Sequence, residues 1–290
     1  MKNSILIPVD FKEQSLVAIR QAYNLAKINN LDLTLLYVYE DSSIWDDLFS
    51  DKQEEEIIEK SKIKIEKLAE EIRQESGLTV YTIVKKGRVY SEILEVAEII
   101  EASYIFMGVA SVFSGKNKAK RIVGANASRV IRSAKCPVVT INSPEHYKGC
   151  RSILLPLDLT EETRQKVKYA IDVAIAYNAT IKVISVIWDT NDKTVRWKLT
   201  AYMEQVKKFI IESGIKCTTE IIEVESSKQA VETILNYAKQ QGDIDLIVIM
   251  TQKEIGFVDF FVGSKAQEII RLSDIPVMSI TPKELGTIYL

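Results

Sequence analysis

Two stretches of nearly the same sequence, SILIPVD at 4–10 and SILLPLD at 152–158, lie 148 residues apart. A second matched pair, AKCPVVTI at 134–141 and SDIPVMSI at 273–280, lies 139 residues apart, so the second copy is nine residues shorter in its middle. A duplicated opening and a duplicated close indicate that one structural unit occurs twice. The sequence therefore predicts a domain at 1–142, a linker at 143–151 and a second domain at 152–290.

Each copy alternates short apolar runs with longer helical patterns. Runs such as LTLLYVY and LIVIM are almost uninterrupted, which is typical of parallel strands buried on both faces. Strands are predicted at 4–9, 31–38, 79–85, 103–107 and 137–141, and at 152–157, 179–186, 216–223, 244–250 and 276–280. A helix is predicted at 51–76 from the apolar stripe of Ile58, Ile65, Leu68 and Ile72. The alternation predicts an α/β fold of two doubly wound, five-stranded parallel-sheet domains of Rossmann type in tandem.

The composition excludes several classes of protein. Hydrophobic residues make up 47% and charged residues 27% of the sequence, and the net charge is −2, which argues against a membrane protein and a general nucleic-acid binder. The opening MKNSILIPVD is interpreted as a first strand and not as a secretory signal, so a cytoplasmic location is expected. Three cysteines without C-x-x-C spacing and the single histidine, His146, predict neither a disulfide framework, nor a zinc site, nor a Ser-His-Asp triad.

The two opening motifs, I-L-[IL]-P-[VL]-D, and the two closing motifs, [CI]-P-V-x-[TS]-I, resemble the universal stress protein (UspA) family in its tandem form. In nucleotide-binding members, an aspartate that ends the first strand contacts the nucleoside, and backbone at the end of the second strand meets adenine. A loop after the fourth strand, G-x2-G-x9-G-[ST], surrounds the ribose and phosphates. Other members lack that loop and bind no ATP. The resemblance therefore implies a UspA-like fold in both domains and leaves nucleotide binding open.

Candidate nucleoside contacts follow the strands of the first copy. Asp10 ends the first strand, where its carboxylate could accept a hydrogen bond from a nucleoside; alternatively, Asp10 or a neighbour in DFKEQS is a helix N-cap. Val38 and Tyr39 end the second strand and would offer backbone to adenine. Gly87 follows the third strand and would let the backbone approach a ligand, unless it is simply a turn glycine.

The stretch MGVASVFSGKNKAKRIVGANASRVI, at 107–131, is the candidate phosphate loop. Gly108, Gly115 and Gly124 supply glycines, but their spacing departs from the family pattern, and Ala125 replaces the expected hydroxyl residue. Polar contacts to a phosphate are predicted from Lys116, Asn126 and Ser128. No acidic residue occurs between 107 and 135, so the loop suits an anion, although it could equally be a solvated basic loop.

The second copy departs further from the family pattern. Thr251 stands where a glycine is expected after the fourth strand, and Glu254 and Asp259 would repel phosphates. Asp158 and the pair Gly263-Ser264 remain, which predicts a degenerate second site.

The leading functional hypothesis is a tandem universal stress protein of the cytoplasm that acts in the stress response and whose first domain could bind ATP weakly, with Mg²⁺ as the accompanying ion. An interaction module without nucleotide is the alternative, and slow ATP hydrolysis is a third. No catalytic residue is predicted, so an enzyme is not expected. The two domains are expected to form an intrachain pseudo-dimer by antiparallel pairing of 137–141 with 276–280, because both are apolar edge strands. A further homodimer is left open, and neither nucleic acid nor membrane is an expected partner.

Overall fold

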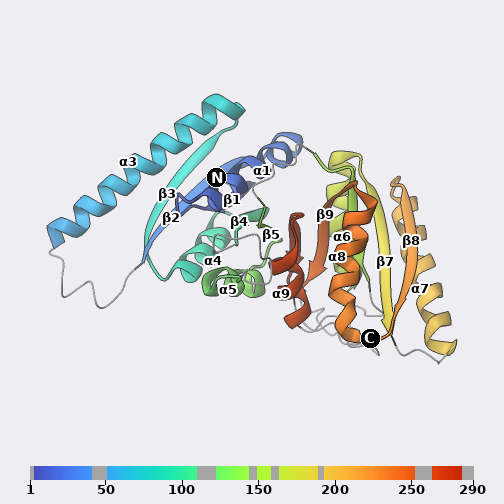
Figure 1. Ribbon diagram of the computed structural model, residues 1–290. Helices are drawn as coiled ribbons and strands as arrows, with labels where there is room; N and C mark the ends of the chain where they lie inside the picture. Colours follow the sequence, from blue (N-terminus) through green and yellow to red (C-terminus); the bar gives the residue numbers. More distant parts are fainter. Residues whose placement is uncertain are drawn as a thin grey trace, which may run out of the picture. The chain divides into compact units, whose positions relative to one another are not determined.

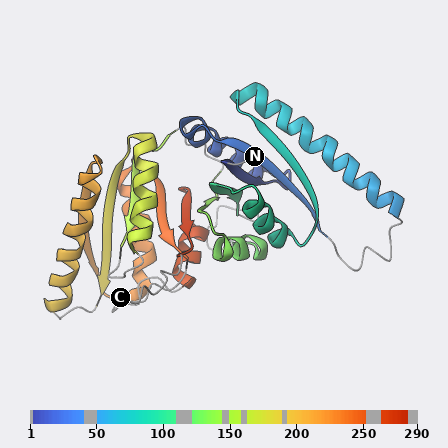
Figure 2. The same cartoon turned by 180° about the vertical axis from the view of Figure 1, so that it is seen from behind.

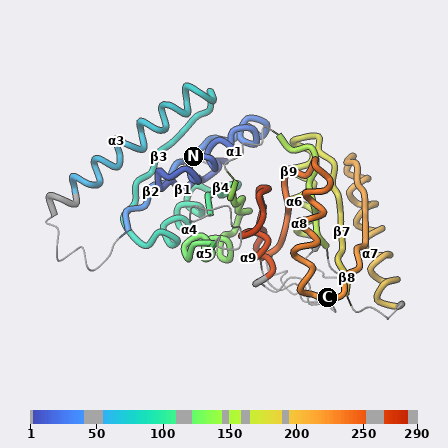
Figure 3. Tube along the Cα trace, in the orientation of Figure 1, coloured from blue at the N-terminus to red at the C-terminus, as the bar shows by residue number. Residues whose placement is uncertain are grey.

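The computed structural model describes residues 3–40, 51–109, 122–143, 149–157, 163–188, 193–251 and 263–282. The packing of the protein divides it into two units, Met1–Lys148 and Gly149–Leu290. Figure 1 shows the helices and strands of both units, and Figure 3 traces the backbone through them. Each unit is described by itself below.

The first unit contains a parallel sheet whose strands lie in the order β3-β2-β1-β4-β5. These strands are β1 (Ser4–Pro8), β2 (Asp32–Glu40), β3 (Val80–Gly87), β4 (Tyr104–Gly108) and β5 (Val138–Ile141). The helices are α1 (Glu13–Asn29), α3 (Asp51–Ser76), α4 (Val89–Ile99) and α5 (Ala125–Ser133). Helices α1 and α3 cover one face of the sheet, whereas α4 and α5 pack together on the other (Figure 1).

The second unit repeats this topology, with the strand order β8-β7-β6-β9-β10. Its strands are β6 (Ser152–Pro156), β7 (Thr180–Trp188), β8 (Cys217–Val224), β9 (Ile244–Met250) and β10 (Val277–Ile280). Its helices are α6 (Thr163–Tyr177), α7 (Lys193–Glu212), the short 3-10 helix η2 (Ser227–Gln229), α8 (Ala230–Gln241) and α9 (Gly263–Leu272). Figure 2 shows α6 and α7 in front of this sheet, opposite the face that α8 and α9 cover in Figure 1. The α/β fold with two doubly wound parallel sheets is thus confirmed.

Both sheets are covered by helices on their two faces because their strands carry apolar side chains on both faces. The side chains of Ile5, Leu6 and Ile7 in β1 are fully buried, and every residue of β9 is buried. On α3, the predicted stripe packs through Ile65 and Ile72, which are buried, while its other face carries exposed glutamates and lysines. Two-sided burial is the expected outcome for parallel strands joined by crossover helices. Within the described ranges, no helix combines the length and apolar character needed to cross a membrane.

A buried carboxylate fixes the beginning of the second unit. Asp245, at the start of β9, accepts hydrogen bonds from the backbone N–H of Arg151 (2.7 Å) and from its Nε (3.0 Å), and its other oxygen accepts one from the guanidinium (2.9 Å). The Asp245 side chain is 5% exposed, so these bonds satisfy a charge that water does not reach. They attach the residue that precedes β6 to the neighbouring strand β9.

In each sheet the strand order reverses beside the central strand, since β1 is followed on one side by β2 and on the other by β4. Ligands of doubly wound sheets bind beyond the carboxyl ends of the strands at such a point. The topology therefore indicates candidate ligand sites at the carboxyl ends of β1, β2 and β4, and at those of their counterparts β6, β7 and β9. The predicted pairing of 137–141 with 276–280 stays a prediction.

Candidate functional site

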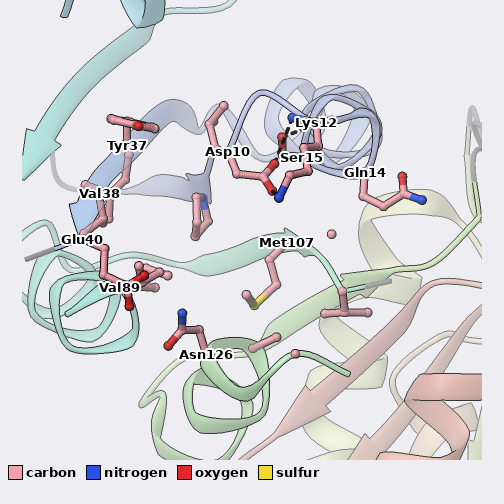
Figure 4. Close-up of a pocket in the computed structure, with 18 of the residues that line it drawn as sticks. Asp10, Lys12, Gln14, Ser15, Tyr37, Val38, Glu40, Val89, Met107 and Asn126 are labelled. Atoms are coloured by element: carbon pink, nitrogen blue, oxygen red, sulfur yellow. Dashed lines mark hydrogen bonds and ion pairs between the residues drawn. The ribbon is translucent and has the colours of Figure 1, made fainter. Parts of the chain in front are cut away.

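A cavity of about 710 Å³ lies at the carboxyl ends of the strands of the first unit. Its walls come from the ends of β1, β2 and β4 and from the first turns of α1, α4 and α5 (Figure 4). Five residues that the sequence analysis proposed for ligand binding line it together: Asp10, Val38, Gly108, Gly124 and Asn126. The topology thus assembles residues from four separate parts of the sequence.

Asp10 is held in a turn before α1. Its Oδ1 accepts a hydrogen bond from the backbone N–H of Lys12 (3.0 Å), and its Oδ2 lies 3.1 Å from the Lys12 Nζ. The N-cap of α1 is Lys12, a neighbour of Asp10 in DFKEQS, and not Asp10 itself. Burial on its own raises the pKa of the Asp10 carboxyl, but hydrogen bonds from Lys12 and Ser15 and the Lys12 charge hold that pKa below its ordinary value. Asp10 is therefore an ionised acceptor at the cavity wall.

The turn after Asp10 depends on Phe11, which the sequence analysis did not select. Its backbone is left-handed, with φ 60°, a costly conformation for a bulky residue. The Phe11 ring centroid lies 5.3 Å from that of Tyr37, and the Nζ of Lys64 lies 4.0 Å from it. Contacts with β2 and α3 thus compensate for the strained backbone that places Asp10 before α1.

The free edge of β2 forms one wall of the cavity. Strand β2 pairs with β1 only as far as Pro8 and Leu36, with the Val9 N–H donating to the Leu36 carbonyl (2.8 Å). It continues to pair with β3 as far as Glu40 and Gly87. Because backbone polar groups alternate sides along a strand, the N–H and C=O of Val38 and Glu40 share the orientation of Leu36 and face the space that β1 has left.

Two of the residues proposed for ligand contact, Tyr39 and Gly87, are not among the described residues that line the cavity. The backbone of Tyr39 faces β3, and the described lining contains Tyr37, Val38 and Glu40 but not Tyr39. Gly87 is also absent from that lining and lies at the end of β3, opposite Glu40. Its φ of 153° and the neighbouring Glu92 side chain, which a Cβ would strike, explain the glycine without a ligand.

Gly108 ends β4 and is required by packing. A Cβ at this position would lie 2.6 Å from the backbone carbonyl carbon of Gln14, in the first turn of α1. The glycine therefore lets α1 approach the end of β4. Gln14 also lines the cavity, and its buried Oε1 has no hydrogen-bond partner among the residues that the structure describes. It is an acceptor available beside Gly108.

The beginning of α5 forms the opposite wall. Gly124 occupies the N-cap position, and a Cβ there would meet no atom of the described residues within 4 Å. Asn126 lines the cavity, whereas Ser128 is not among the described lining residues and donates its backbone N–H to the Gly124 carbonyl (2.9 Å). The first N–H groups of a helix have no partner within the helix and attract anions. Gly115 and Lys116, and the neighbouring Lys118 and Lys120, lie outside the described residues.

Strand pairing corrects the alignment of the second unit. Gly108 pairs with Ile141 in β5, and its counterpart, which pairs with Ile280 in β10, is Met250 and not Thr251. Met250 is 1% exposed. A buried methionine thus occupies the place where the first unit needs a glycine to admit the start of its helix. Of the predicted second-site residues, Asp158 lies outside the described residues, and Gly263 and Ser264 open α9.

A cation–π contact joins the end of β7 to the beginning of α9 in the second unit. The Nζ of Lys265, in the first turn of α9, lies 4.4 Å from the ring centroid of Trp188, at the end of β7. By the repeat offsets, Trp188 corresponds to Glu40 and Lys265 to Asn126. The counterparts of two residues that line the cavity of the first unit are therefore in contact with each other in the second.

Comparisons with known proteins agree with this description. The sequence profile of the universal stress protein family matches residues 1–142 and 149–280. A relative, Universal stress protein MJ0531 of Methanocaldococcus jannaschii, is 35% identical over 150 residues, which make up 49% of this protein and 82% of the relative.

Two solved structures support the fold. A universal stress protein from Archaeoglobus fulgidus is 20% identical, with a TM-score of 0.73, and the match covers 97% of both proteins. A functionally unknown protein, PA1789, from Pseudomonas aeruginosa is also 20% identical, with a TM-score of 0.67, and the match covers 97% of this protein and 93% of that one. Since the family profile matches once in each unit and spans almost all of the sequence, the chain belongs to the universal stress protein family, in a tandem form.

Proposed function

We propose that the first unit binds ATP, with Mg²⁺ as the accompanying ion, and that the protein acts in the cytoplasmic stress response through this binding and not as an enzyme. The observation that carries the proposal is the arrangement of the two cavity walls. The free edge of β2 and the Asp10 carboxylate lie on one side, and the beginning of α5 lies on the other.

The two walls suit the two ends of a nucleotide. The backbone N–H and C=O of Val38 can pair with the polar edge of a base, and Asp10 can accept a hydrogen bond from a ribose hydroxyl. At the other wall, the N–H groups of α5 favour phosphate, and the lysines at 116, 118 and 120 add positive charge to the sequence that precedes this helix. A nucleotide placed in the opposite direction would bring its phosphates to the carboxylates of Asp10 and Glu40.

Binding without catalysis fits the chemistry of the lining. A general base works best with a pKa near the working pH, and the pKa of Asp10 is lowered away from that range. No group of three or more His, Cys, Asp or Glu side chains in the described ranges could hold a metal ion. Mg²⁺ would therefore be bound mainly by the phosphates of the nucleotide, as is common for this ion.

The second unit is proposed to have a structural or interaction role. Its Trp188 and Lys265 side chains make contact where the first unit has facing cavity walls, and Met250 replaces the close-packed Gly108. These differences favour the interaction-module alternative for this unit.

Thermal unfolding and calorimetric titration of the whole protein with Mg-ATP test the proposal. Gly124→Asp would place a carboxylate at the start of α5, where a Cβ meets no atom of the described residues within 4 Å, so we expect ATP affinity to fall at least tenfold with little change in stability. The matched control is Gly263→Asp, at the corresponding position of the second unit, which should leave ATP affinity unchanged. At an ATP concentration of about 100 times Kd, the parent should gain about 2.7 kcal/mol of stability.

A second arm tests the lysines at 116, 118 and 120. Replacing all three with alanine should weaken ATP binding and reduce its dependence on salt, because fewer charges would then attract the phosphates. The proposal is wrong if the parent protein gains no stability from Mg-ATP. It is assigned to the wrong unit if Gly263→Asp abolishes binding and Gly124→Asp does not.

A further inference from the structure

The last residue of β2, Glu40, brings an uncommitted carboxylate to the cavity. Glu40 is exposed, lines the cavity and lies beside Val89 of α4 (Figure 4). Among the residues that the structure describes, its side chain takes part in no hydrogen bond or ion pair. Asp10, by contrast, is already engaged with Lys12. Glu40 is thus a hydrogen-bond acceptor on the cavity wall where the proposed function places the base of the nucleotide.

Glu40 lies on the edge of β2 that is not paired with β1. Its backbone, like that of Val38, faces the space beyond the end of β1, because β1 stops pairing at Leu36 while β3 continues to Glu40. A planar base that uses the N–H and C=O of this edge therefore lies within reach of the Glu40 side chain, two residues further along the same strand.

The second unit shows where a side chain at this position of the strand points. Trp188, the counterpart of Glu40, extends to Lys265 at the beginning of α9. The last position of this strand therefore directs its side chain across the carboxyl end of the sheet in both units. Only the first unit has a hydrogen-bond acceptor there.

We infer that Glu40 selects purines that carry an amino group at position 6 over purines that carry an oxygen there. An ionised carboxylate has acceptors and no donors, so it can accept a hydrogen bond from the 6-amino group of adenine. The other hydrogen of that amino group is free for a backbone carbonyl of the strand edge. A 6-oxo purine would place a carbonyl oxygen against the carboxylate and leave both acceptors without a donor.

This inference rests on the proposed function, because it concerns the same cavity. The structure gives it a separate test: ATP differs from inosine triphosphate in the group at position 6 and keeps the same sugar and phosphates. The ratio of the two dissociation constants therefore reports on the base wall alone, whereas the absolute affinity for ATP reports on the site as a whole.

The experiment is calorimetric titration of the whole protein with Mg-ATP and with Mg-inosine triphosphate, for the parent and for Glu40→Gln. The parent should bind ATP at least tenfold more tightly, because inosine triphosphate leaves both the Glu40 carboxylate and the strand-edge carbonyl without a donor. In Glu40→Gln this preference should fall about tenfold, since the new amide can donate to the oxygen at position 6 while the strand-edge carbonyl is unchanged. Glu95→Gln, which removes the same charge from α4 outside the described cavity lining, should keep the parent ratio. Because Glu40 is exposed, the thermal unfolding of Glu40→Gln should match the parent.

Each outcome of these titrations either supports or overturns the role of Glu40. If ATP binds and Glu40→Gln keeps the parent ratio, the role of Glu40 is wrong while the proposed function stands. Tighter binding of inosine or guanosine triphosphate than of ATP by the parent would also overturn it. If the parent binds no nucleotide, the proposed function and the inference both fail.

Discussion

The ammonium group of Lys265 lies 4.4 Å from the centre of the Trp188 ring, so that α9 contacts the end of β7 in the second unit. Their counterparts in the first unit, Asn126 and Glu40, line a cavity of about 710 Å³. Two copies of one fold, encoded by one repeated sequence, thus differ at the carboxyl ends of their strands. The difference arises from side chains at element ends, whereas strand order is the same in both units.

We expect Trp188 and Lys265 to be energetically coupled. A cation over a partly exposed indole contributes about 0.5–1 kcal/mol. A double-mutant cycle with Trp188→Leu and Lys265→Met, followed by urea unfolding, should give a coupling free energy of that size. Strictly additive changes in the free energy of unfolding would mean that the contact does not contribute to stability.

Gly108 and Gly124 should respond differently to alanine. Gly108→Ala would bring a Cβ to 2.6 Å from the Gln14 backbone, so α1 must shift, at a cost of about 1–3 kcal/mol in the free energy of unfolding. Gly124→Ala places its Cβ in open space at a φ of −58° and should change stability by less than about 0.5 kcal/mol. Equal losses in denaturant unfolding would contradict the proposed close approach of α1 and β4.

Substitutions of Phe11 should measure the free-energy cost of its left-handed backbone conformation. Phe11→Ala and Phe11→Asn both remove the ring contacts with Tyr37 and Lys64. Asparagine tolerates the left-handed conformation better than alanine, so Phe11→Asn should be the more stable of the two by about 1 kcal/mol. Chemical denaturation of both variants measures the difference, and a more stable alanine variant would argue against a φ of 60° in solution.

The Asp245 carboxylate should contribute more to stability than the guanidinium that it binds. Asp245→Ala leaves the backbone N–H of Arg151 without its acceptor, which should lower the free energy of unfolding by about 1–3 kcal/mol. Arg151→Ala removes a side chain that is 65% exposed and keeps the backbone hydrogen bond, so its effect should be smaller. The opposite order in urea unfolding would show that the guanidinium, and not the backbone bond, fixes this edge of β6.

Alkaline pH should destabilise the protein through Cys150. Burial, followed by the charge of Asp245, raises the pKa of this thiol from 9.0 to about 12. Above about pH 9 the unfolded protein loses this proton while the folded protein keeps it, so the stability present below pH 9 declines as the pH rises toward 12. The parent should therefore lose about 1.4 kcal/mol more than Cys150→Ala between about pH 7.5 and about pH 10. Parallel pH profiles of urea unfolding for the two proteins would refute this assignment.

The sequence by itself was sufficient to predict the two α/β repeats and the positions of their strands, and it predicted which residues from distant segments lie at the carboxyl ends of those strands. Hydrophobic periodicity marks strands, and a doubly wound topology brings the carboxyl ends of β1, β2 and β4 together. For that reason Asp10, Val38 and Gly124, which are far apart in the sequence, could be assigned to one site before the structure was known.

Only the tertiary structure decided which residues near those ends face the cavity. Glu40, and not Tyr39, lines the described cavity at the end of β2, where the pairing with β1 has ended at Leu36 while the pairing with β3 continues, and the length of a neighbouring strand is not encoded in β2. Met250, and not Thr251, corresponds to Gly108 because hydrogen-bond register, and not residue count, aligns the two sheets. Periodicity is a local property of the sequence, whereas register, close approach and burial depend on contacts between distant segments.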